Sequence, residues 1–240
     1  MEEAVRLIKD SQHMVALTGA GVSQESGIPT FRGTDGLWRQ YDVSRLATPD
    51  AFETNPSLVW EWYSWRIGLI SECRPNRAHI TLASWEHRGL LKALITQNVD
   101  GLHQAAGSKN VIEVHGSIHH VRCTVCRYRG PTPVQIEGIP VCPECRAYLR
   151  PDVVWFGEAL DQSILQSVYH HLQSADVCLV IGTSGLVQPA ATFPFIVKFL
   201  GGHVIEINPD RTPLTDISDV RLAGKAAETM ARLDELVTGT

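Results

Sequence analysis

The sequence of 240 residues lacks the features that define several large classes of protein. No apolar run approaches the ~18–20 residues of a membrane-spanning helix. The first ten residues contain no apolar stretch of the kind found in signal peptides. Positive charge is not in excess, because 26 Asp and Glu outnumber 21 Lys and Arg and give a net charge of −5. These absences argue against binding to nucleic acids or membranes, and we expect a soluble, cytoplasmic protein.

The composition is that of a folded protein with a substantial core. Hydrophobic residues make up 44% of the chain and charged residues 20%, so intrinsic disorder is excluded. No internal repeat or low-complexity segment is present. Since domains usually contain ~100–200 residues, this length accommodates one or two of them.

Short β-branched runs alternate along the chain with longer helical patterns. Most of these runs show no alternation of polar and apolar residues, which is typical of strands buried on both faces of a parallel sheet. The predicted strands are Met14–Thr18, Lys92–Thr96, Val111–Val114, Val153–Phe156, Val177–Gly182 and Val204–Ile207. Helix start and stop signals bound residues 55–71, 75–89 and 161–174. The alternation predicts an α/β fold with a doubly wound, mainly parallel, six-stranded Rossmann-like sheet.

Two stretches interrupt this alternation. Residues 35–84 contain helical patterns but no strand, which predicts a helical insert module. Residues 119–151 contain four cysteines and short polar runs, which predicts a small module held together by a metal ion, because so short a segment has too little core to fold alone. The Rossmann-like domain would then comprise residues 1–34, 85–118 and 152–240.

Four of the six cysteines form two Cys-x-x-Cys pairs with 15 residues between them. This spacing is typical of a tetrahedral zinc site, whereas the alternative, two disulfides, is more typical of small secreted proteins. Four thiolates would leave no coordination position open for water, so the predicted zinc ion is structural rather than catalytic. The predicted ligands are Cys123, Cys126, Cys142 and Cys145.

A glycine-containing segment, residues 19–23 with the sequence GAGVS, directly follows the first predicted strand. Glycines at this point let the backbone turn sharply and approach a pyrophosphate, whose charge the N-terminus of a following helix stabilises. A full dinucleotide-binding motif would have a third glycine where this chain has Gln24. The segment alone therefore fits a dinucleotide site and an ordinary strand-to-helix turn equally well.

Polar side chains follow two other predicted strands. Gln97, Asn98 and Asp100 follow the second strand, and His115 directly follows the third. Ligands of open α/β sheets bind at the carboxyl ends of the strands. Neutral amides beside one carboxylate suit ribose hydroxyls and a carboxamide, and a histidine there suits a general base near neutral pH. An Asx turn that caps a helix is the alternative interpretation of residues 97–100.

Other loops carry weaker candidates. Phe31 could shield a reactive centre from water, and the adjacent Arg32 could pair with phosphate or orient a ribose. The alternative is a buried loop anchor beside a surface charge. Residues 182–184 and Asn208 follow later strands, and residues 224–226 open the last predicted helix. Each could contact a nucleotide or form an ordinary turn.

Taken together, these segments resemble a sirtuin, a Sir2-like protein. The matching motifs occur in the family's order from about residue 15 to about residue 226, which is nearly the whole chain. They are GAGVS at 19–23, GIPTFRG at 27–33, QNVD at 97–100, HG at 115–116, the paired Cys-x-x-Cys, RPDVVWFGE at 150–158 and GTS at 182–184. The resemblance implies an NAD-dependent protein-lysine deacylase that uses NAD as co-substrate and acts on acylated proteins or peptides.

The resemblance also implies roles for individual residues. His115 would be the general base, and Asn98, also assigned to catalysis, would hold the nicotinamide ribose. Val154, Phe156 and Gly157 would pair with an extended substrate peptide, backbone to backbone. The residues implied to bind NAD are Gly19, Ala20, Gly21, Ser23, Thr30, Phe31, Arg32, Trp38, Gln97, Asn98, Asp100, Gly182, Thr183, Ser184, Asn208 and Ala226.

In the implied reaction, the acyl-lysine carbonyl oxygen attacks the ribose carbon that bears nicotinamide, and His115 takes a proton from a ribose hydroxyl. The products are free lysine, nicotinamide and O-acyl-ADP-ribose. Two alternatives use the same NAD site, namely mono-ADP-ribosyl transfer to protein and a non-catalytic NAD-sensing module. Intact Asn98, Asp100 and His115 argue against the second, because a module that only binds NAD needs no base.

Three further residues bear on the acyl group that is removed. Tyr63 and Arg66 are three residues apart, so they share one face of the predicted helix. A guanidinium beside a phenol suits a carboxylate. With the small Ala47 upstream, this Tyr-x-x-Arg resembles the sirtuins that remove succinyl and malonyl groups. In the alternative, Tyr63 is a core residue, Arg66 is a solvated charge, and the protein is a plain deacetylase.

Overall fold

The chain folds around a six-stranded parallel sheet with the strand order β3-β2-β1-β7-β8-β9. The computed structural model describes residues 1–31, 36–37 and 41–239. All residues of β1 and β7 are buried, which explains why their sequences show no polar alternation. The strands are β1 (Met14–Thr18), β2 (Leu91–Thr96), β3 (Val111–Glu113), β7 (Val177–Ile181), β8 (His203–Ile207) and β9 (Val220–Leu222).

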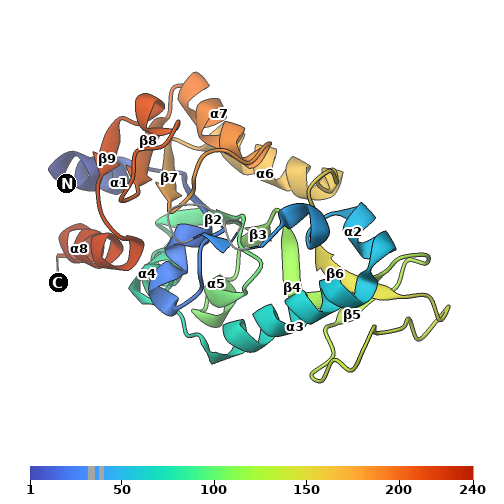
Figure 1. Ribbon diagram of the computed structural model, residues 1–240. Helices are drawn as coiled ribbons and strands as arrows, with labels where there is room; N and C mark the ends of the chain where they lie inside the picture. Colours follow the sequence, from blue (N-terminus) through green and yellow to red (C-terminus); the bar gives the residue numbers. More distant parts are fainter. Residues whose placement is uncertain (32–35, 38–40, 240) are drawn as a thin grey trace.

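Helices cover both faces of this sheet (Figure 1). In β1, Met14 joins a core with α1, α4 and α8 on one face, and Val15 joins a core with α6 and α7 on the other. The predicted doubly wound α/β fold is therefore confirmed. The helices are α1 (Glu2–Asp10), α4 (Arg77–His87), α6 (Gln162–Ser174), α7 (Phe193–Phe199) and α8 (Ala226–Thr238).

The strand order reverses between β1 and β7. From β1 the chain moves through β2 to β3 in one direction, and from β7 it moves through β8 to β9 in the other. Such a switch point leaves a crevice outside the carboxyl ends of the two central strands, where ligands of open α/β sheets bind. The topology thus fixes where a ligand site can form.

One predicted strand is wrong, and one strand of the main sheet escapes prediction. Of the run Val153–Phe156, only Val153 lies in a strand, and that strand, β6 (Leu149–Val153), belongs to a second sheet. The sixth strand of the main sheet is instead β9, in which Leu222 alone is buried. Three residues with one buried side chain leave no apolar run for a sequence pattern to detect.

A second lobe lies beside the main sheet (Figure 1). It combines two helices with a three-stranded antiparallel sheet of order β5-β4-β6. The helices and the small sheet share one hydrophobic core, within which the Trp60 indole N–H donates to the Leu149 carbonyl at 2.8 Å. The bounds of the three predicted modules stay a prediction. The elements of this lobe are α2 (Pro49–Thr54), α3 (Pro56–Glu72), β4 (Gly116–Cys123), β5 (Arg129–Pro131) and β6.

The four predicted zinc ligands come together beside the small sheet. Their Sγ atoms all lie within 4.8 Å of one another. The Cys123 and Cys145 sulfurs are 3.4 Å apart and the Cys126 and Cys142 sulfurs 3.5 Å apart. A disulfide would need ~2.05 Å, whereas a thiolate tetrahedron with Zn–S bonds of ~2.3 Å has edges of ~3.8 Å. The cluster fits one structural zinc ion, and it does not fit the disulfide alternative.

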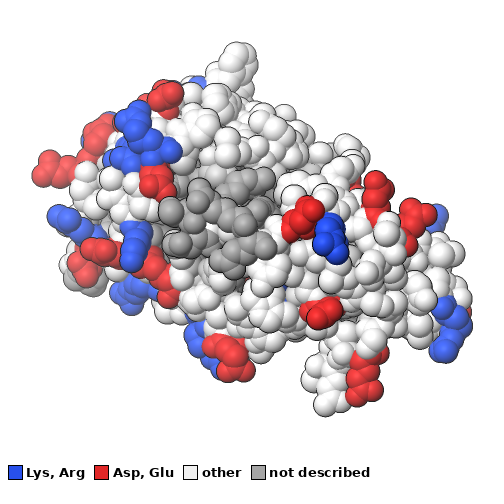
Figure 2. Space-filling model, in the orientation of Figure 1, with Lys and Arg blue, Asp and Glu red and all other residues white. Residues whose placement is uncertain are grey.

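The surface agrees with the charge balance of the sequence. On the face seen in Figure 2, the acidic and basic side chains of the described residues are interspersed, and no basic patch forms. Within the described parts of the chain, no helix is long and apolar enough to cross a membrane.

We predict that Cys142→Ser releases the zinc ion and destabilises the second lobe by more than ~3 kcal/mol, because metal binding supplies folding energy to so small a module. Cys142 is fully buried among the four ligands. The measurement is the zinc content of the purified protein together with its unfolding in urea. Cys73→Ala, which changes a cysteine outside the cluster, is expected to retain one zinc per chain. Stoichiometric zinc in Cys142→Ser, or none in the unaltered protein, would contradict this assignment.

Candidate active site

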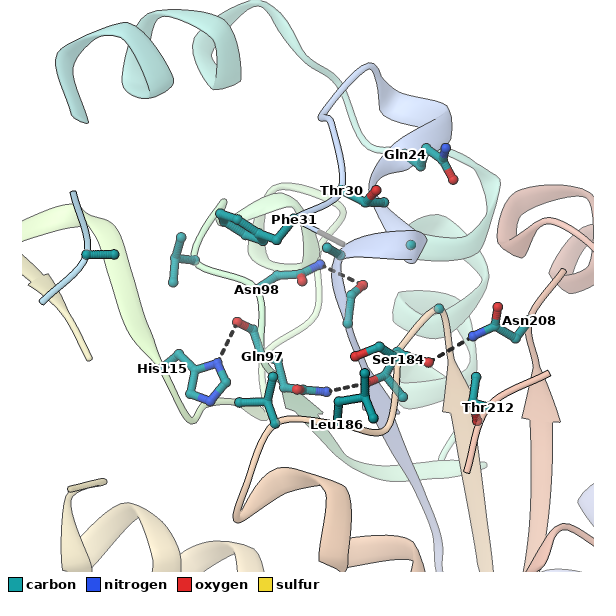
Figure 3. A pocket seen from close by; sticks show the side chains of 18 of the residues that line it. Gln24, Thr30, Phe31, Gln97, Asn98, His115, Ser184, Leu186, Asn208 and Thr212 are labelled. Carbon is teal, nitrogen blue, oxygen red and sulfur yellow. Dashed lines mark hydrogen bonds between the residues drawn. The ribbon is translucent and has the colours of Figure 1, made fainter. Parts of the chain in front are cut away.

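A cavity of about 680 Å³ lies at the switch point of the sheet. It is lined on one side by the loops after β1, β2, β7 and β8, and on the other by α3 and residues 153–158. Figure 3 shows polar side chains of these loops gathered about it. Two predicted NAD ligands, Arg32 and Trp38, lie outside the residues that the structure describes. The predicted site residues that line the cavity are Gly19, Ala20, Gly21, Thr30, Phe31, Ala47, Tyr63, Arg66, Gln97, Asn98, His115, Val154, Phe156, Gly157, Gly182, Thr183, Ser184, Asn208 and Ala226.

The loop after β1 meets the loop after β7 backbone to backbone. The Gly21 N–H donates to the Gly182 carbonyl at 2.8 Å, and a Cβ at Gly21 would lie only 2.8 Å from the Gly182 Cα. Gly182 has a φ of +60°, and a Cβ there would lie 2.5 Å from the Val22 nitrogen. Glycine is therefore needed at both positions for the two loops to touch. This requirement comes from the contact between the loops and does not depend on a ligand.

The loop after β1 does not continue into the α-helix that a dinucleotide-binding motif predicts. Two short 3-10 turns follow it instead, η1 (Ala20–Val22) and η2 (Gln24–Ser26). The second ends at Gly27, whose φ of +94° turns the chain away. The prediction that a helix N-terminus follows this loop and faces a pyrophosphate is therefore wrong. The chain also lacks the third glycine of the motif, since Gln24 occupies that position.

Two other predicted NAD ligands, Ser23 and Asp100, do not line the cavity. Both are buried, and the Ser23 hydroxyl donates to an Asp100 carboxylate oxygen at 2.7 Å. The side-chain amide of Asn98 in turn donates to the Ser23 hydroxyl and to the Gly19 carbonyl, both at 3.2 Å. Ser23 and Asp100 thus lie behind Asn98 and hold its side chain in place.

Two buried histidines extend this network. His79 Nε2 lies 3.4 Å from the Ser23 hydroxyl, and His79 Nδ1 accepts the N–H of Asn76 at the start of α4. His103 Nε2 lies 3.0 Å from the Thr18 hydroxyl. Burial lowers the pKa of His79 to about 4 and the pKa of His103 well below its usual value. Both rings are therefore neutral at physiological pH.

A backbone hydrogen bond fixes the ring of His115 in one tautomer. Its Nδ1 lies 3.1 Å from the Gln97 carbonyl oxygen (Figure 3). A carbonyl can only accept a hydrogen bond, so Nδ1 carries the proton of the neutral ring. Nε2 is then the basic nitrogen. The predicted general base is thus held by the loop after β2 in the tautomer that leaves Nε2 able to take a proton.

Thr183 ties together the loops at the carboxyl edge of the sheet. Its hydroxyl accepts a hydrogen bond from the Gln97 side chain at 2.8 Å, and its carbonyl accepts one from the Asn208 side chain at 2.8 Å. These contacts join the ends of β2, β7 and β8 (Figure 3). The polar side chains predicted from three separate strand ends are therefore brought into one wall of the cavity.

Tyr63 and Arg66 lie on α3 at the opposite wall, and both are buried. The Arg66 guanidinium is 4.5 Å from the centre of the Phe31 ring and 5.2 Å from that of Trp62, close enough for cation–π attraction. Among the described residues, no carboxylate comes within 4.0 Å of it. Burial lowers the pKa of Arg66 to about 10 and raises the pKa of Tyr63 to about 12, so at neutral pH one is a cation and the other a neutral phenol.

Residues 153–157 cross between the sheet and the second lobe. The Val154 N–H donates to the His115 carbonyl and the Phe156 N–H to the Ala47 carbonyl. The Trp155 N–H donates to the Glu158 carboxylate at 2.8 Å. Three successive backbone donors of this segment are therefore already bonded within the protein. A substrate peptide could pair with it only through its remaining groups, which restricts the predicted backbone pairing.

Several residues that line the cavity escape prediction. Trp62 is one of several aromatic residues on α3, and the sequence offers no reason to single it out. Leu186, Arg211 and Thr212 lie in loops beyond the strand ends, where pattern gives no guidance. Trp155 falls within the motif RPDVVWFGE, and this position is the sequence signal that could have placed it at the site.

Comparisons with known proteins find relatives that match nearly the whole chain. The model of the Sir2 family matches residues 19–189. An NAD-dependent protein deacylase of Pyrococcus furiosus is 52% identical over 240 residues, covering 97% of this chain and 96% of the relative. A solved Sir2 homologue in complex with NAD is 51% identical, with a TM-score of 0.95 over 100% of this chain and 94% of its own. A Sir2 structure with a p53 peptide and NAD is 34% identical, with a TM-score of 0.91, and the match covers 100% of this chain and 99% of the solved chain.

These matches extend along nearly the whole chain in sequence and along all of it in fold. The sirtuin resemblance deduced from the motifs is confirmed. The chain belongs to the Sir2 family.

Proposed function

We propose that this protein removes acidic acyl groups, succinyl and malonyl, from protein lysines, and that it also removes acetyl groups. Its relatives at about 50% identity are named NAD-dependent protein deacylases, and membership of the Sir2 family makes this chain an NAD-dependent protein-lysine deacylase. The preference for acidic acyl groups is the finer part of the proposal. The observation that carries it is the buried cation of Arg66 on the cavity wall.

The sheet side of the cavity suits NAD. Glycine backbones at the loops after β1 and β7, the side chains of Gln97 and Asn98, and the loop at Asn208 offer the donors and acceptors that phosphates, ribose hydroxyls and a carboxamide require. Bound NAD supplies the ribose carbon that accepts the acyl oxygen when nicotinamide leaves, and the acyl group ends on ADP-ribose. In our proposal Asn98, held by Ser23, orients the ribose, and Phe31 keeps water from the reacting carbon.

His115 acts as the general base in this proposal. Its Nδ1–H is bonded to the Gln97 carbonyl, so Nε2 takes the proton from a ribose hydroxyl. The imidazolium that forms keeps the same hydrogen bond, because its Nδ1 remains a donor. The backbone carbonyl of Gln97 therefore stabilises the ring both before and after proton transfer.

The wall opposite suits a carboxylate. Burying a charge without an ion pair costs several kcal/mol. Among the described residues no carboxylate lies within 4.0 Å of Arg66, and Asp100 favours its charged form only from a longer distance. A succinyl or malonyl carboxylate would provide the missing partner, with the Tyr63 hydroxyl as a second donor. An acetyl group offers no charge there, so it would gain nothing from Arg66.

We expect His115→Asn to lower kcat for acyl removal by ~10²–10⁴-fold, the usual contribution of a positioned base. An asparagine amide can still donate to the Gln97 carbonyl, but it cannot take a proton at neutral pH. Acyl loss from a peptide is followed by mass spectrometry, with the exposed His120→Asn as the control variant. A fall of less than ~3-fold in His115→Asn would remove this residue from the proton transfer.

Arg66→Met is expected to reduce kcat/KM for a succinyl-lysine peptide by ~30–100-fold, which corresponds to the ~2–3 kcal/mol of a charge-assisted pair. For the matched acetyl-lysine peptide we expect a change below ~3-fold. Arg74→Met, which alters an exposed arginine just beyond α3, is the control and is expected to leave both values unchanged. If acetyl turnover dominates in the unaltered protein and Arg66→Met affects both peptides equally, the protein is a plain deacetylase.

A further inference from the structure

The inference rests on the proposed preference for acidic acyl groups and concerns how that preference is set. Trp155 lies on the cavity wall next to Tyr63, and both side chains are 3% exposed. The indole Nε1–H of Trp155 donates to the Tyr63 hydroxyl oxygen at 2.8 Å. Trp155 belongs to the crossing segment after β6, whereas Tyr63 is on α3. The hydrogen bond therefore joins two distant parts of the chain on the cavity wall that contains Arg66.

The direction of this hydrogen bond is not ambiguous. An indole nitrogen can only donate, whereas a phenol has one proton to donate and two lone pairs to accept with. Tyr63 must therefore use a lone pair toward Trp155, and its own proton points elsewhere. Among the described residues, no group accepts that proton.

The ring of Trp155 is held firmly in this position. The Arg150 guanidinium carbon lies 3.2 Å from the centre of the Trp155 ring, and the Phe52 ring centre lies 5.4 Å away. Arg150 donates to both carboxylate oxygens of Glu158, at 2.6 and 2.9 Å. Partial burial alone would raise the pKa of Glu158, but the hydrogen bonds from Arg150 and from the Trp155 backbone hold this pKa below its usual value. The carboxylate is thus ionised at neutral pH and fixes Arg150 against the indole.

We propose that Trp155 is a specificity-positioning residue: by donating to the Tyr63 hydroxyl, it directs the Tyr63 proton to the carboxylate of an acidic acyl group beside Arg66. Trp155 need not touch the acyl carboxylate to do this. An acetyl group has no carboxylate to accept the proton, so its removal does not depend on the orientation of Tyr63. The competing interpretation is that Trp155 only fills the core of the second lobe.

The test is Trp155→Phe, which keeps an aromatic ring beside Arg150 and Phe52 but removes the indole N–H. We expect kcat/KM for a succinyl-lysine peptide to fall about tenfold, as for a hydrogen bond to a charged group. For the acetyl-lysine peptide we expect a change of less than about twofold. Tyr63→Phe and the double variant complete a mutant cycle. Because Trp155 acts only through the Tyr63 hydroxyl, the double variant is expected to lose no more than Tyr63→Phe alone.

Trp60→Phe is the matched control. Trp60 lies in the same hydrophobic core, is 1% exposed, and also donates its indole N–H at 2.8 Å, but to the Leu149 carbonyl and away from the cavity. It is expected to lower the melting temperature about as much as Trp155→Phe and to leave the ratio of succinyl to acetyl turnover unchanged. A ratio that falls equally in both variants would show a general effect of core damage and overturn the proposal.

A second readout does not depend on turnover. In ¹⁵N–¹H spectra, the indole resonance of Trp155, assigned with Trp155→Phe, should shift and exchange faster in Tyr63→Phe, since its acceptor is gone. An unchanged resonance would overturn the proposed hydrogen bond.

These experiments distinguish a failure of the proposed acyl preference from a failure of the role proposed for Trp155. If the unaltered protein shows no preference for succinyl-lysine, the proposed specificity fails and this inference fails with it. If the preference is present and Arg66→Met removes it while Trp155→Phe does not, only the role of Trp155 is wrong. Additive losses in the double variant would likewise count against it, because they would show two independent effects.

Discussion

The contact between the loops after β1 and β7 is the constraint on which the site depends. Gly21 and Gly182 touch backbone to backbone at the point where the strand order reverses. Because neither position tolerates a Cβ, the crevice outside the two central strands keeps a fixed shape. The side chains at the ends of β2 and β8 are then joined to the same edge through Thr183. Backbone packing therefore determines the shape of the cavity wall proposed to bind NAD, and the side chains are positioned on that wall.

The second lobe completes the cavity by a different means. The zinc-binding cysteines hold the small sheet together, and β6 of that sheet leads directly into residues 153–158. From there, contacts run from Glu158 through Arg150 and Trp155 to Tyr63 on α3. The structural metal site is thus connected to the cavity wall that contains Tyr63 and Arg66, and none of the described cysteines lines the cavity.

Much of this could be read from the sequence where the signal is local. The spacing of the four cysteines is set by the geometry of one metal ion, and His115 follows a strand whose direction fixes where its side chain emerges. The sequence could not predict strand β9 or the structure of the run after Val153. Their structures depend on which strands they pair with rather than on their composition. Ser23 and Asp100 carry the right chemistry in the right motifs, but only tertiary packing determines that they stand behind Asn98 rather than on the cavity wall.

In the proposed function, one cavity brings NAD and an acidic acyl-lysine together, with Arg66 as the partner of the acyl carboxylate. The most direct measurement is a crystal structure with a succinyl-lysine peptide and ADP-ribose. We expect a carboxylate oxygen within ~3 Å of both the Arg66 guanidinium and the Tyr63 hydroxyl. We also expect the acyl carbonyl of the modified lysine to point toward the ribose near His115. An acyl carboxylate in solvent, with Arg66 still packed on Phe31 and unbonded, would contradict it.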